Sequence, residues 1–253
     1  ATLIPVVGDK KHINLGPRLS VIFAYYANPQ MFRYQLEHFS AMDLDVLSQI
    51  EILVVDDASP NWPAANEAAG FRQLPLKVFR VREDKPWNQD AARNIGAFEA
   101  QGQMLLLTDV DHLVPEESLR LLLGIGVTSE VNSLSRKAHF SSRDKVVRSH
   151  ANSYVMSRQK YWEIGGYDED FWGTYGSDVL FRRRIEKNCK IVELPHVRLE
   201  VATKGSISDA KNLNLSRTPS IWRRARGVFL RGLKMLRLLP SPRVLENPYD
   251  RVL

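Results

Sequence analysis

Short, almost continuously apolar runs alternate with longer segments of helical spacing in the first half of the chain. The runs, which have the composition of strands covered on both faces, are 19–24, 50–55, 76–81 and 104–107. Between them, 31–41 and 88–101 carry apolar side chains three or four positions apart, and Gly102 marks the end of the second of these helices. This alternation predicts an α/β fold with a mostly parallel central sheet that is flanked by helices.

The second half of the chain has a less regular pattern. It predicts a helix at 115–123, a strand at 154–156, a basic helix from Ser177 onward and a short strand at 191–195. Residues 161–173 are rich in glycine and aromatic side chains and show neither period. Such a segment is typical of a functional loop, or of a tight corner packed by its tryptophans.

Two carboxylates follow the last apolar run of the first half, in Thr108-Asp109-Val110-Asp111-His112. Because side chains alternate along an extended backbone, Asp109 and Asp111 should lie on one side, about 6 to 7 Å apart, with His112 pointing away. Neighbouring anions at the end of a buried strand are costly unless a cation or hydrogen-bond donors lie between them. The pattern predicts a site for Mg²⁺ or Mn²⁺, or else an Asp-rich loop in which one carboxylate caps the next helix.

Unusual polar residues also follow the first two strands. Tyr25, Tyr26 and Asn28 come after the first, and Asp56 and Asp57 follow the second. In open parallel sheets, ligands bind beyond the carboxyl ends of the strands. The polar side chains at the three strand ends are therefore expected to meet around one ligand.

Composition is that of an ordinary globular protein. The 253 residues are 44% hydrophobic and 25% charged, and no run approaches the roughly 18 apolar residues of a membrane span. Cys189 is the single cysteine, so the chain can form neither an intrachain disulfide nor a cysteine-based zinc site. A reducing compartment fits this composition, and a cytoplasmic location is expected.

The positive net charge of +6 is concentrated near the end of the chain, where no acidic residue lies between Asp209 and Glu246. In the same region one helical face is apolar and surrounded by arginines; it consists of Trp222, Ala225, Phe229, Leu233 and Leu236. This pattern is typical of a helix on anionic lipid, so a peripheral membrane contact through 217–239 is one expectation. The alternatives are a helix docked on the rest of the chain with its arginines in solvent, and a contact with nucleic acid.

Taken together, residues 19–196 resemble glycosyltransferases of the GT-A fold, close to family 2. The resemblance rests on the order and spacing of the strand before Tyr25 and of residues 54–59, 91–96, 108–111 and 165–169 with 173–178. The last piece, preceded by 154–157, is also similar to the carboxyl half of β-1,4-galactosyltransferases and polypeptide N-acetylgalactosaminyltransferases. The resemblance implies a GT-A (Rossmann-like) catalytic domain at 1–203, with a nucleotide-binding half at 17–112 and an acceptor-binding half at 113–203. A basic, helical C-terminal extension would follow at 204–253.

The same resemblance implies which residues bind the donor. The nucleotide would contact Tyr25, Asp56, Asp57, Arg93, Asn94 and Asp109. Asp57 would accept a hydrogen bond from a uracil N–H, and Arg93 would supply positive charge, unless it is merely an exposed charge on its helix. Asp111 and Asp109 would bind Mn²⁺ or Mg²⁺. His196 is the candidate for a further metal ligand, although a lone histidine is more often structural.

Asp178 would be the general base. Because the acceptor hydroxyl has a pKa far above 7, a positioned carboxylate must take its proton as it attacks the sugar. A base on the side of the sugar opposite the metal gives inversion, and Gly166, Trp172 and Ser177 would contact the acceptor. The family usually has Glu-Asp where this chain has Ser177-Asp178, which leaves the role of the first position open. Asp178 could also cap its helix.

The sequence thus predicts a metal-dependent, inverting glycosyltransferase of polysaccharide biosynthesis. It would move a sugar from a UDP-linked donor to a hydroxyl of a glycan or lipid-linked glycan. Two alternatives are a DNA or modified-base glycosyltransferase that uses the basic tail, and a non-catalytic glycan- or nucleotide-binding module in which Ser177 reflects loss of the active site. A nucleotidyltransferase is disfavoured, because 25–29 is not the glycine-rich, basic loop that holds a triphosphate.

Overall fold

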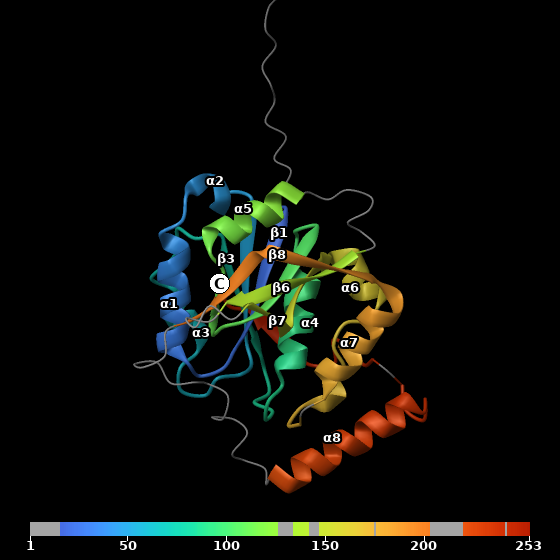
Figure 1. The fold of residues 1–253 in the computed structure, drawn as a ribbon. Coiled ribbons are helices and arrows are strands. Elements are labelled where there is room, and N and C mark those ends of the chain that lie inside the picture. Colours follow the sequence, from blue (N-terminus) through green and yellow to red (C-terminus); the bar gives the residue numbers. More distant parts are fainter. Residues whose placement is uncertain (1–15, 126–133, 142–146, 175, 203–219, 241) are drawn as a thin grey trace, which may run out of the picture.

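The computed structural model describes residues 16–125, 134–141, 147–174, 176–202, 220–240 and 242–253. Within these residues, a nine-stranded sheet forms the centre of the molecule, with helices on both of its faces (Figure 1). Its strands, in spatial order, are β5 (His112–Leu113), β8 (Lys190–Val201), β6 (Leu134–Ser141), β7 (Val147–Ser157), β4 (Met104–Asp109), β1 (Leu19–Tyr25), β2 (Ile50–Asp56), β3 (Leu76–Val81) and β9 (Tyr249–Arg251).

The central strands β3, β2, β1 and β4 run parallel, which confirms the predicted α/β architecture. The antiparallel strands β7 and β9 extend this core on either side. In the register of the sheet, Tyr25 pairs with Asp56 and Ala24 pairs with Asp109. The strands β1, β2 and β4 therefore end at one edge of the sheet, which we call the carboxyl edge.

Helices cover both faces of the sheet. One face carries α1 (Pro29–Ser40), α2 (Leu44–Leu47), α3 (Ala64–Ala68) and α5 (Glu116–Ile125), and the other carries α4 (Gln89–Glu99), α6 (Arg158–Glu163) and α7 (Ser177–Asn188). Successive residues of β1 enter two separate cores, so that Phe23 packs on the side of α1 and Ile22 packs on the side of α4 and α7. This explains the nearly continuous apolar run, because both faces of the strand are covered. Ser20 of β1 is a buried polar exception, and its hydroxyl donates to Glu51 of β2 at 2.6 Å.

The seating of α4 against β1 depends on Gly96. A Cβ atom at this position would lie 2.4 Å from Cγ2 of Ile22, far inside van der Waals contact. Glycine thus lets the helix approach the strand closely. The approach holds the first turns of α4, which carry Asp90 and Arg93, over the carboxyl edge.

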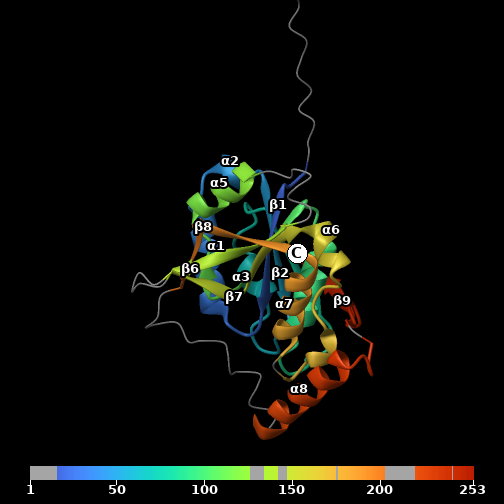
Figure 2. The same ribbon diagram turned by 45° about the vertical axis from the view of Figure 1, so that its right-hand side comes forward.

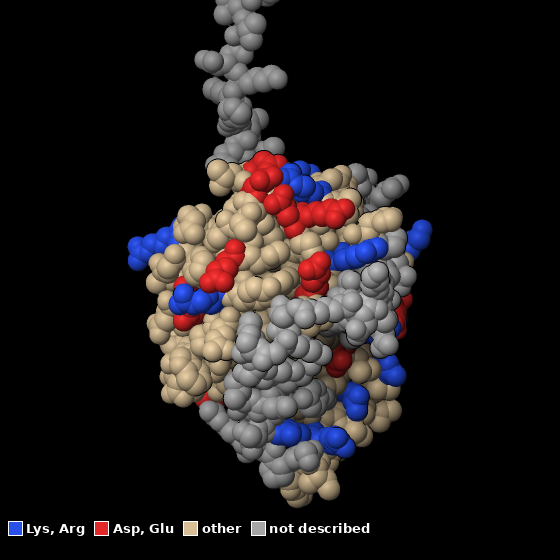
Figure 3. Space-filling model, turned by 60° about the vertical axis from the view of Figure 1, so that its left-hand side comes forward, with Lys and Arg blue, Asp and Glu red and all other residues tan. Residues whose placement is uncertain are grey.

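Charged side chains gather at the end of the molecule that carries α2 and α5 (Figure 3). Here Arg120 forms ion pairs with the exposed Asp43 and Asp45 and with the half-buried Glu116. Because α2 leads directly into the start of β2, this surface lies beside the amino ends of the strands. It is therefore remote from the carboxyl edge.

The last described residues return to the sheet. The helix α8 (Ser220–Met235) lies at the end of the molecule opposite α2 (Figures 1 and 2), and β9 then pairs antiparallel with the edge strand β3. No strand was expected at 249–251, since the segment is polar, but edge pairing uses backbone groups and needs no apolar run. None of the helices that the structure describes is long and apolar enough to cross a membrane. The division of the chain at residue 203 remains a prediction.

Candidate active site at the carboxyl edge of the sheet

Asp56, at the end of β2, shapes the loop that follows it. One carboxylate oxygen accepts a hydrogen bond from the backbone N–H of Ser59 (2.8 Å), and the other accepts from the N–H of Ala64 (2.9 Å). Burial raises the pKa of this carboxyl group above its usual range. Both oxygens are thus occupied by the protein itself, which favours a structural role over the predicted contact with a nucleotide.

Asp57 is different, because only one of its oxygens is engaged. Its Oδ2 accepts from the backbone N–H of Asn88, directly before α4, at 2.9 Å. Its Oδ1 is buried and has no hydrogen-bond partner among the described residues, and burial raises the pKa of the group well above its usual range. A buried acceptor without a donor is unfavourable, so Oδ1 offers a position that an N–H group of a ligand could fill.

Tyr25, predicted to contact the nucleotide, is almost fully buried. Its hydroxyl donates to the carbonyl oxygen of Trp62 at 2.7 Å, and its ring lies 5.2 Å from that of Phe32 in α1. Burial raises the pKa of the hydroxyl. These contacts fix the loop after β2 against β1, and the predicted nucleotide contact remains untested.

Asp109, Asp111 and His112 converge after β4. One potential ligand atom from each of the three side chains lies within 4.8 Å of the others, and Nδ1 of His112 is 2.6 Å from Oδ1 of Asp111. The expectation that His112 points away was wrong. Regular strand ends at Asp109, and the turn through Val110 and Asp111 interrupts the alternation of side chains.

Gln35 of α1 holds this turn in place, a role that the sequence analysis missed. Its buried amide donates hydrogen bonds to the carbonyl oxygens of Val110 (2.8 Å) and His112 (2.7 Å). The clamp fixes the backbone on both sides of Asp111. A side-chain amide donating across a distance of some 75 positions leaves no signal in a single sequence.

The donor set of the turn fits a divalent cation. Two carboxylates and an imidazole suit Mn²⁺, and the carboxylates suit Mg²⁺. His196, the predicted third ligand, is exposed on β8 and does not belong to this group. Val201 of β8 pairs with His112, whereas His196 lies five residues earlier, where the register of β8 against β6 shifts. His112 is therefore better placed than His196 to bind an ion together with Asp109 and Asp111, and ligation by His196 stays a prediction.

Arg93 is not an exposed helix charge, because only 1% of the side chain is accessible. Its Nη2 donates to Oδ1 of Asp109 at 2.5 Å, and its guanidinium carbon lies 5.0 Å from the ring centroid of Tyr167. Its Nε and Nη1 have no hydrogen-bond partner among the described residues. Arg93 therefore brings a buried positive charge, with unused donors, next to the acidic turn.

Asp90, one turn before Arg93, is a second residue that the sequence analysis missed. It is buried, its Oδ1 has no partner among the described residues, and burial raises its pKa to about 7. A hydrogen bond from Ser177 and the nearby charges of Arg93 and Asp178 also act on this group. Asp90 thus brings a carboxyl group to the start of α7, where Ser177 replaces the usual Glu. An acid in the first turn of a helix is too common to have signalled this.

Asn94, predicted to lie near the nucleotide, instead fixes the glycine-rich segment. Its Oδ1 accepts from the hydroxyl of Tyr161 (2.6 Å) and from the N–H of Tyr167 (2.9 Å), and its Nδ2 donates to the carbonyl oxygen of Tyr167 (2.9 Å) and to Glu169 (2.8 Å). The amide group has no further donor and at most little further acceptor capacity. Its geometry favours a structural role.

Gly166, one of the predicted acceptor residues, lies against this amide. It has a φ of +61°, and a Cβ there would lie 2.7 Å from Oδ1 of Asn94. Any other residue would be strained and would collide with the amide. The carbonyl oxygen of Gly166 accepts from Arg184 of α7, so the segment connects α4 to the helix of Asp178.

The remaining predicted acceptor residues differ in accessibility. The ring of Trp172, just after the short 3₁₀ helix η2 (Glu169–Phe171), is 41% exposed and lies under the guanidinium of Arg226, 4.5 Å from its carbon. Ser177 is buried at the start of α7, and Asp178 in the same first turn is partly accessible. Trp172 and Asp178 are thus open to a ligand, whereas Ser177 faces Asp90.

These groups occupy one region. Asp57 follows β2 and Asp109 ends β4, on either side of β1, and the register offsets them by two residues. With neighbouring strands about 4.8 Å apart and about 3.3 Å per residue, their Cα atoms are about 12 Å from one another. Contact of Asp109 with Arg93, and of Asp90 with the start of α7, then connects this edge to Asp178. The carboxyl edge can therefore present an acceptor for an N–H group, a cation site and a partly accessible carboxylate to one ligand.

Comparisons with known proteins identify the family and the fold. Residues 20–186 match the family model of glycosyl transferase family 2, and no curated protein matches the chain significantly in sequence. Similar solved structures include S. aureus TarS 1–349 (TM-score 0.59, 17% identity, 73% of this chain and 60% of that chain). Others are the mannosyltransferase PcManGT from Pyrobaculum calidifontis in complex with GDP-Man and Mn²⁺ (0.60, 18%, 89% and 66%) and GalNAc-T7 with UDP, GalNAc and Mn²⁺ (0.57, 16%, 91% and 53%).

At these identities the structural likeness shows the fold, and the chain spans only 60% of TarS 1–349. The sequence match is more specific, because it covers well over half of the chain and includes the strand ends, the start of α4, the acidic turn and the first turns of α7. We conclude that the chain belongs to glycosyl transferase family 2 and has the GT-A fold.

Proposed function

We propose that the protein is a metal-dependent, inverting glycosyltransferase that moves a sugar from a UDP-linked donor to a hydroxyl of a glycan or lipid-linked glycan. The observation that carries the proposal is the cluster of Asp109, Asp111 and His112 at the carboxyl edge. Asp57 at the same edge and Asp178 near Asp90 support it. Such a reaction belongs to polysaccharide biosynthesis. The expected cytoplasmic location stays part of the proposal.

The donor side is argued from unfilled hydrogen-bonding groups. Oδ1 of Asp57, which has no partner among the described residues, would accept a ring N–H of uracil. Nε and Nη1 of Arg93, which also have none in that part of the chain, would bind diphosphate oxygens in charge-assisted hydrogen bonds. The complexes of TarS 1–349 with UDP-GlcNAc and of GalNAc-T7 with UDP, GalNAc and Mn²⁺ support a donor of this kind.

The metal would be held by Asp109 and Asp111, with His112 as the third ligand that the geometry favours and His196 as the alternative. A divalent ion at this position supplies positive charge that stabilises the leaving diphosphate. Arg93, bonded to Asp109, orients that carboxylate and adds positive charge of its own. The potential ligand atoms of Asp109, Asp111 and His112 are of a kind that Mn²⁺ binds, and they lie within 4.8 Å of one another, close enough to hold one ion.

Asp178 would accept the proton of the acceptor hydroxyl as that oxygen attacks the anomeric carbon from the side opposite the diphosphate. Trp172 offers an exposed ring for stacking against a sugar, and Gly166 and Ser177 complete the proposed acceptor side. Asp90 has a pKa of about 7, so at neutral pH much of it is protonated. In that form it can lie beside Asp178 without placing a second full negative charge there.

The test compares Asp178→Asn with the wild type and with Glu186→Gln, a carboxyl-to-amide change on an exposed residue of the same helix. UDP release from UDP-sugars is measured with Mn²⁺ present, and water takes the place of the acceptor hydroxyl. Loss of the base should lower kcat by about 10² to 10⁴ with little change in UDP affinity, whereas Glu186→Gln should retain full activity.

Two results would contradict the proposal. If Asp178→Asn turned over as fast as the wild type, Asp178 would not be the base. If the wild type bound nucleotides but released no UDP from any UDP-sugar, the protein would be the non-catalytic binding module. Transfer to DNA, the remaining alternative, requires the tail to bind duplex DNA in a salt-dependent manner.

A further inference from the structure

The side of α8 that faces away from the domain is apolar. Its exposed side chains, from 54% to 72% accessible, are Ile221, Trp222, Val228, Phe229, Met235 and, directly after the helix, Leu236. At 100° per residue these positions, with the small Ala225 and Gly232 between them, fall within a sector about 140° wide. Within 221–236, all of which the structure describes, no charged residue falls in that sector. We call it the outer face of α8.

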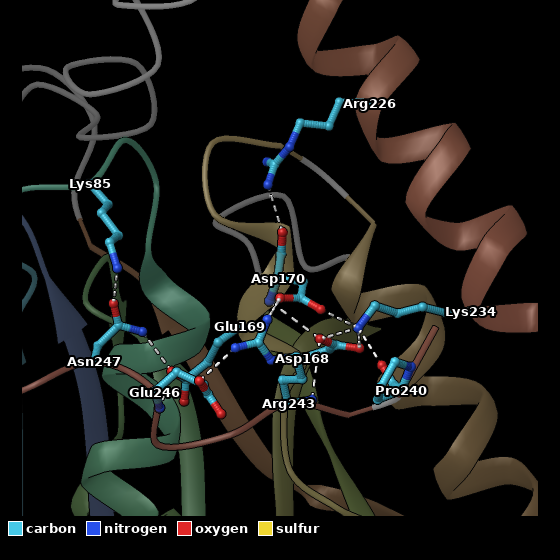
Figure 4. A network of polar contacts seen from close by, with 10 residues as sticks. All are labelled: Lys85, Asp168, Glu169, Asp170, Arg226, Lys234, Pro240, Arg243, Glu246 and Asn247. Atoms are coloured by element: carbon cyan, nitrogen blue, oxygen red, sulfur yellow. Dashed lines mark hydrogen bonds and ion pairs between the residues drawn. The ribbon is translucent and has the colours of Figure 1, made fainter. Parts of the chain in front are cut away.

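The opposite side of α8 carries Arg223 and Lys234 together with Leu230 and Gly227, and it is fixed to the domain. Lys234 is buried there, with Nζ at 2.7 Å from Asp168, 2.6 Å from Asp170 and 2.8 Å from the carbonyl oxygen of Pro240 (Figure 4). Arg226, near the other end of the helix, donates to the carbonyl oxygen of Asp170 at 2.9 Å. A surface helix normally turns its apolar side to the core, so α8 is docked in the reverse sense.

The occupant that fits the outer face is a bilayer with anionic lipids. Arg224 borders the apolar sector and Arg237 follows it, both exposed, and the chain carries no acidic residue between Asp209 and Glu246. An apolar sector bordered by arginines matches the two components of such a surface, acyl chains and negative headgroups. A nucleic acid would instead require cations across the outer face, where the side chains are apolar.

The docked side connects α8 to the proposed acceptor residues. The guanidinium of Arg226 lies over the ring of Trp172, and the hydroxyl of Thr174 donates to the backbone carbonyl of Arg223 at 2.5 Å. Both contacts fall in the segment that leads into Ser177 and Asp178. A membrane bound to the outer face would therefore lie across α8 from the acceptor side of the site, about 10 Å away.

We propose that α8 is a membrane-docking helix whose outer face inserts into an anionic bilayer and holds the acceptor side of the site about one helix diameter from it. The part of this inference that concerns the acceptor rests on the proposed function, and it assigns the acceptor to the lipid-linked class. The docking itself stands on the exposure and orientation of α8.

The test uses the full chain and large unilamellar vesicles, of phosphatidylcholine alone or with phosphatidylglycerol, in a co-sedimentation assay. The docking variant carries Phe229→Ser and Leu236→Ser. The matched control carries Phe98→Ser and Leu44→Ser, the same two changes at side chains that are 54% and 81% exposed on α4 and α2. The wild type and the control should bind the anionic vesicles, and the docking variant should bind on the order of 100-fold more weakly.

The inference is overturned by any of three results. One is a wild type that does not sediment with anionic vesicles. Another is a docking variant that binds as well as the control. The third is self-association or duplex DNA binding that the docking variant abolishes, which would assign the outer face to a second copy or to nucleic acid.

UDP release, measured without vesicles, separates this inference from the proposed function. The docking variant should release UDP from UDP-sugars at the wild-type rate. A protein that docks through α8 but never releases UDP refutes the glycosyltransferase and leaves the docking intact. A protein that releases UDP but does not bind vesicles refutes the membrane docking and leaves the glycosyltransferase intact.

Discussion

Replacing Lys234 by methionine should strongly weaken the attachment of α8. Its side chain is 1% accessible, and its ammonium group makes close contacts with Asp168, which is itself inaccessible, with Asp170 and with the carbonyl oxygen of Pro240 (Figure 4). Methionine has a similar length but no charge. The change would leave two carboxylates, one fully buried, without their cation.

The magnitude follows from the burial of the pair. Removing one partner of a buried ion pair costs about 3 to 5 kcal/mol, because the other charge stays desolvated. Arg243, 3.2 Å from Asp170, can compensate part of this loss at Asp170. Because Arg243 offsets part of the cost at Asp170 while Asp168 stays buried, we expect the free energy of unfolding to fall by nearer 3 than 5 kcal/mol.

Urea denaturation followed by circular dichroism measures the loss, and hydrogen exchange over 220–240 shows whether α8 detaches before the domain unfolds. The control is Lys160→Met, which breaks a pair at the surface with Glu163 and should have only a marginal effect. Adding Asp168→Asn to Lys234→Met should recover part of the stability, because it removes the uncompensated charge. A Lys234→Met protein with unchanged stability and unchanged exchange would refute this reasoning.

Three further predictions concern the core and the site. Gly96→Ala should cost about 1 to 3 kcal/mol in urea denaturation, because the new Cβ would collide with Ile22; a neutral effect would mean that α4 can shift freely. Burial raises the pKa of Asp90 from 3.8 to about 7, so the wild type should lose up to about 4 kcal/mol of stability as the pH rises from 4 to 7. Asp90→Asn should remove that loss, and parallel pH profiles of the two proteins would disprove the shift. Asp57→Asn should weaken UDP binding in calorimetry by about tenfold or more, and unaltered affinity would exclude Asp57 as the base-binding group.

The strands and the carboxyl edge could be predicted because they depend on local pattern. A strand covered on both faces is mostly apolar, and the runs of β1, β2 and β4 show this, with Ser20 and Glu51 as buried polar exceptions. The approach of Asp109 and Asp111 after β4 could be predicted for the same reason, because they follow an apolar run directly. His112 could not be placed, since its direction depends on a turn that Gln35 of a distant helix stabilises.

The burial of Asp90 and Arg93 could not be read from the sequence either. Both lie on α4 among small residues, and only the packing of the glycine-rich segment and of α7 over that helix removes them from solvent. The orientation of α8 is a similar case. Its apolar face was visible as a pattern, but Lys234 decides which side meets the domain, through two carboxylates more than 60 positions earlier in the chain.

The central claim is that one nucleotide and one cation bind together at the carboxyl edge. Thermal denaturation with UDP, with and without Mn²⁺, tests it most directly. A ligand at 100 times its Kd adds about 2.7 kcal/mol, so UDP with Mn²⁺ should raise the Tm by about 5 to 10 °C. UDP alone should have a much smaller effect, and Asp111→Asn should abolish the contribution of the metal. No shift with UDP and Mn²⁺, or an equal shift in Asp111→Asn, would contradict the account.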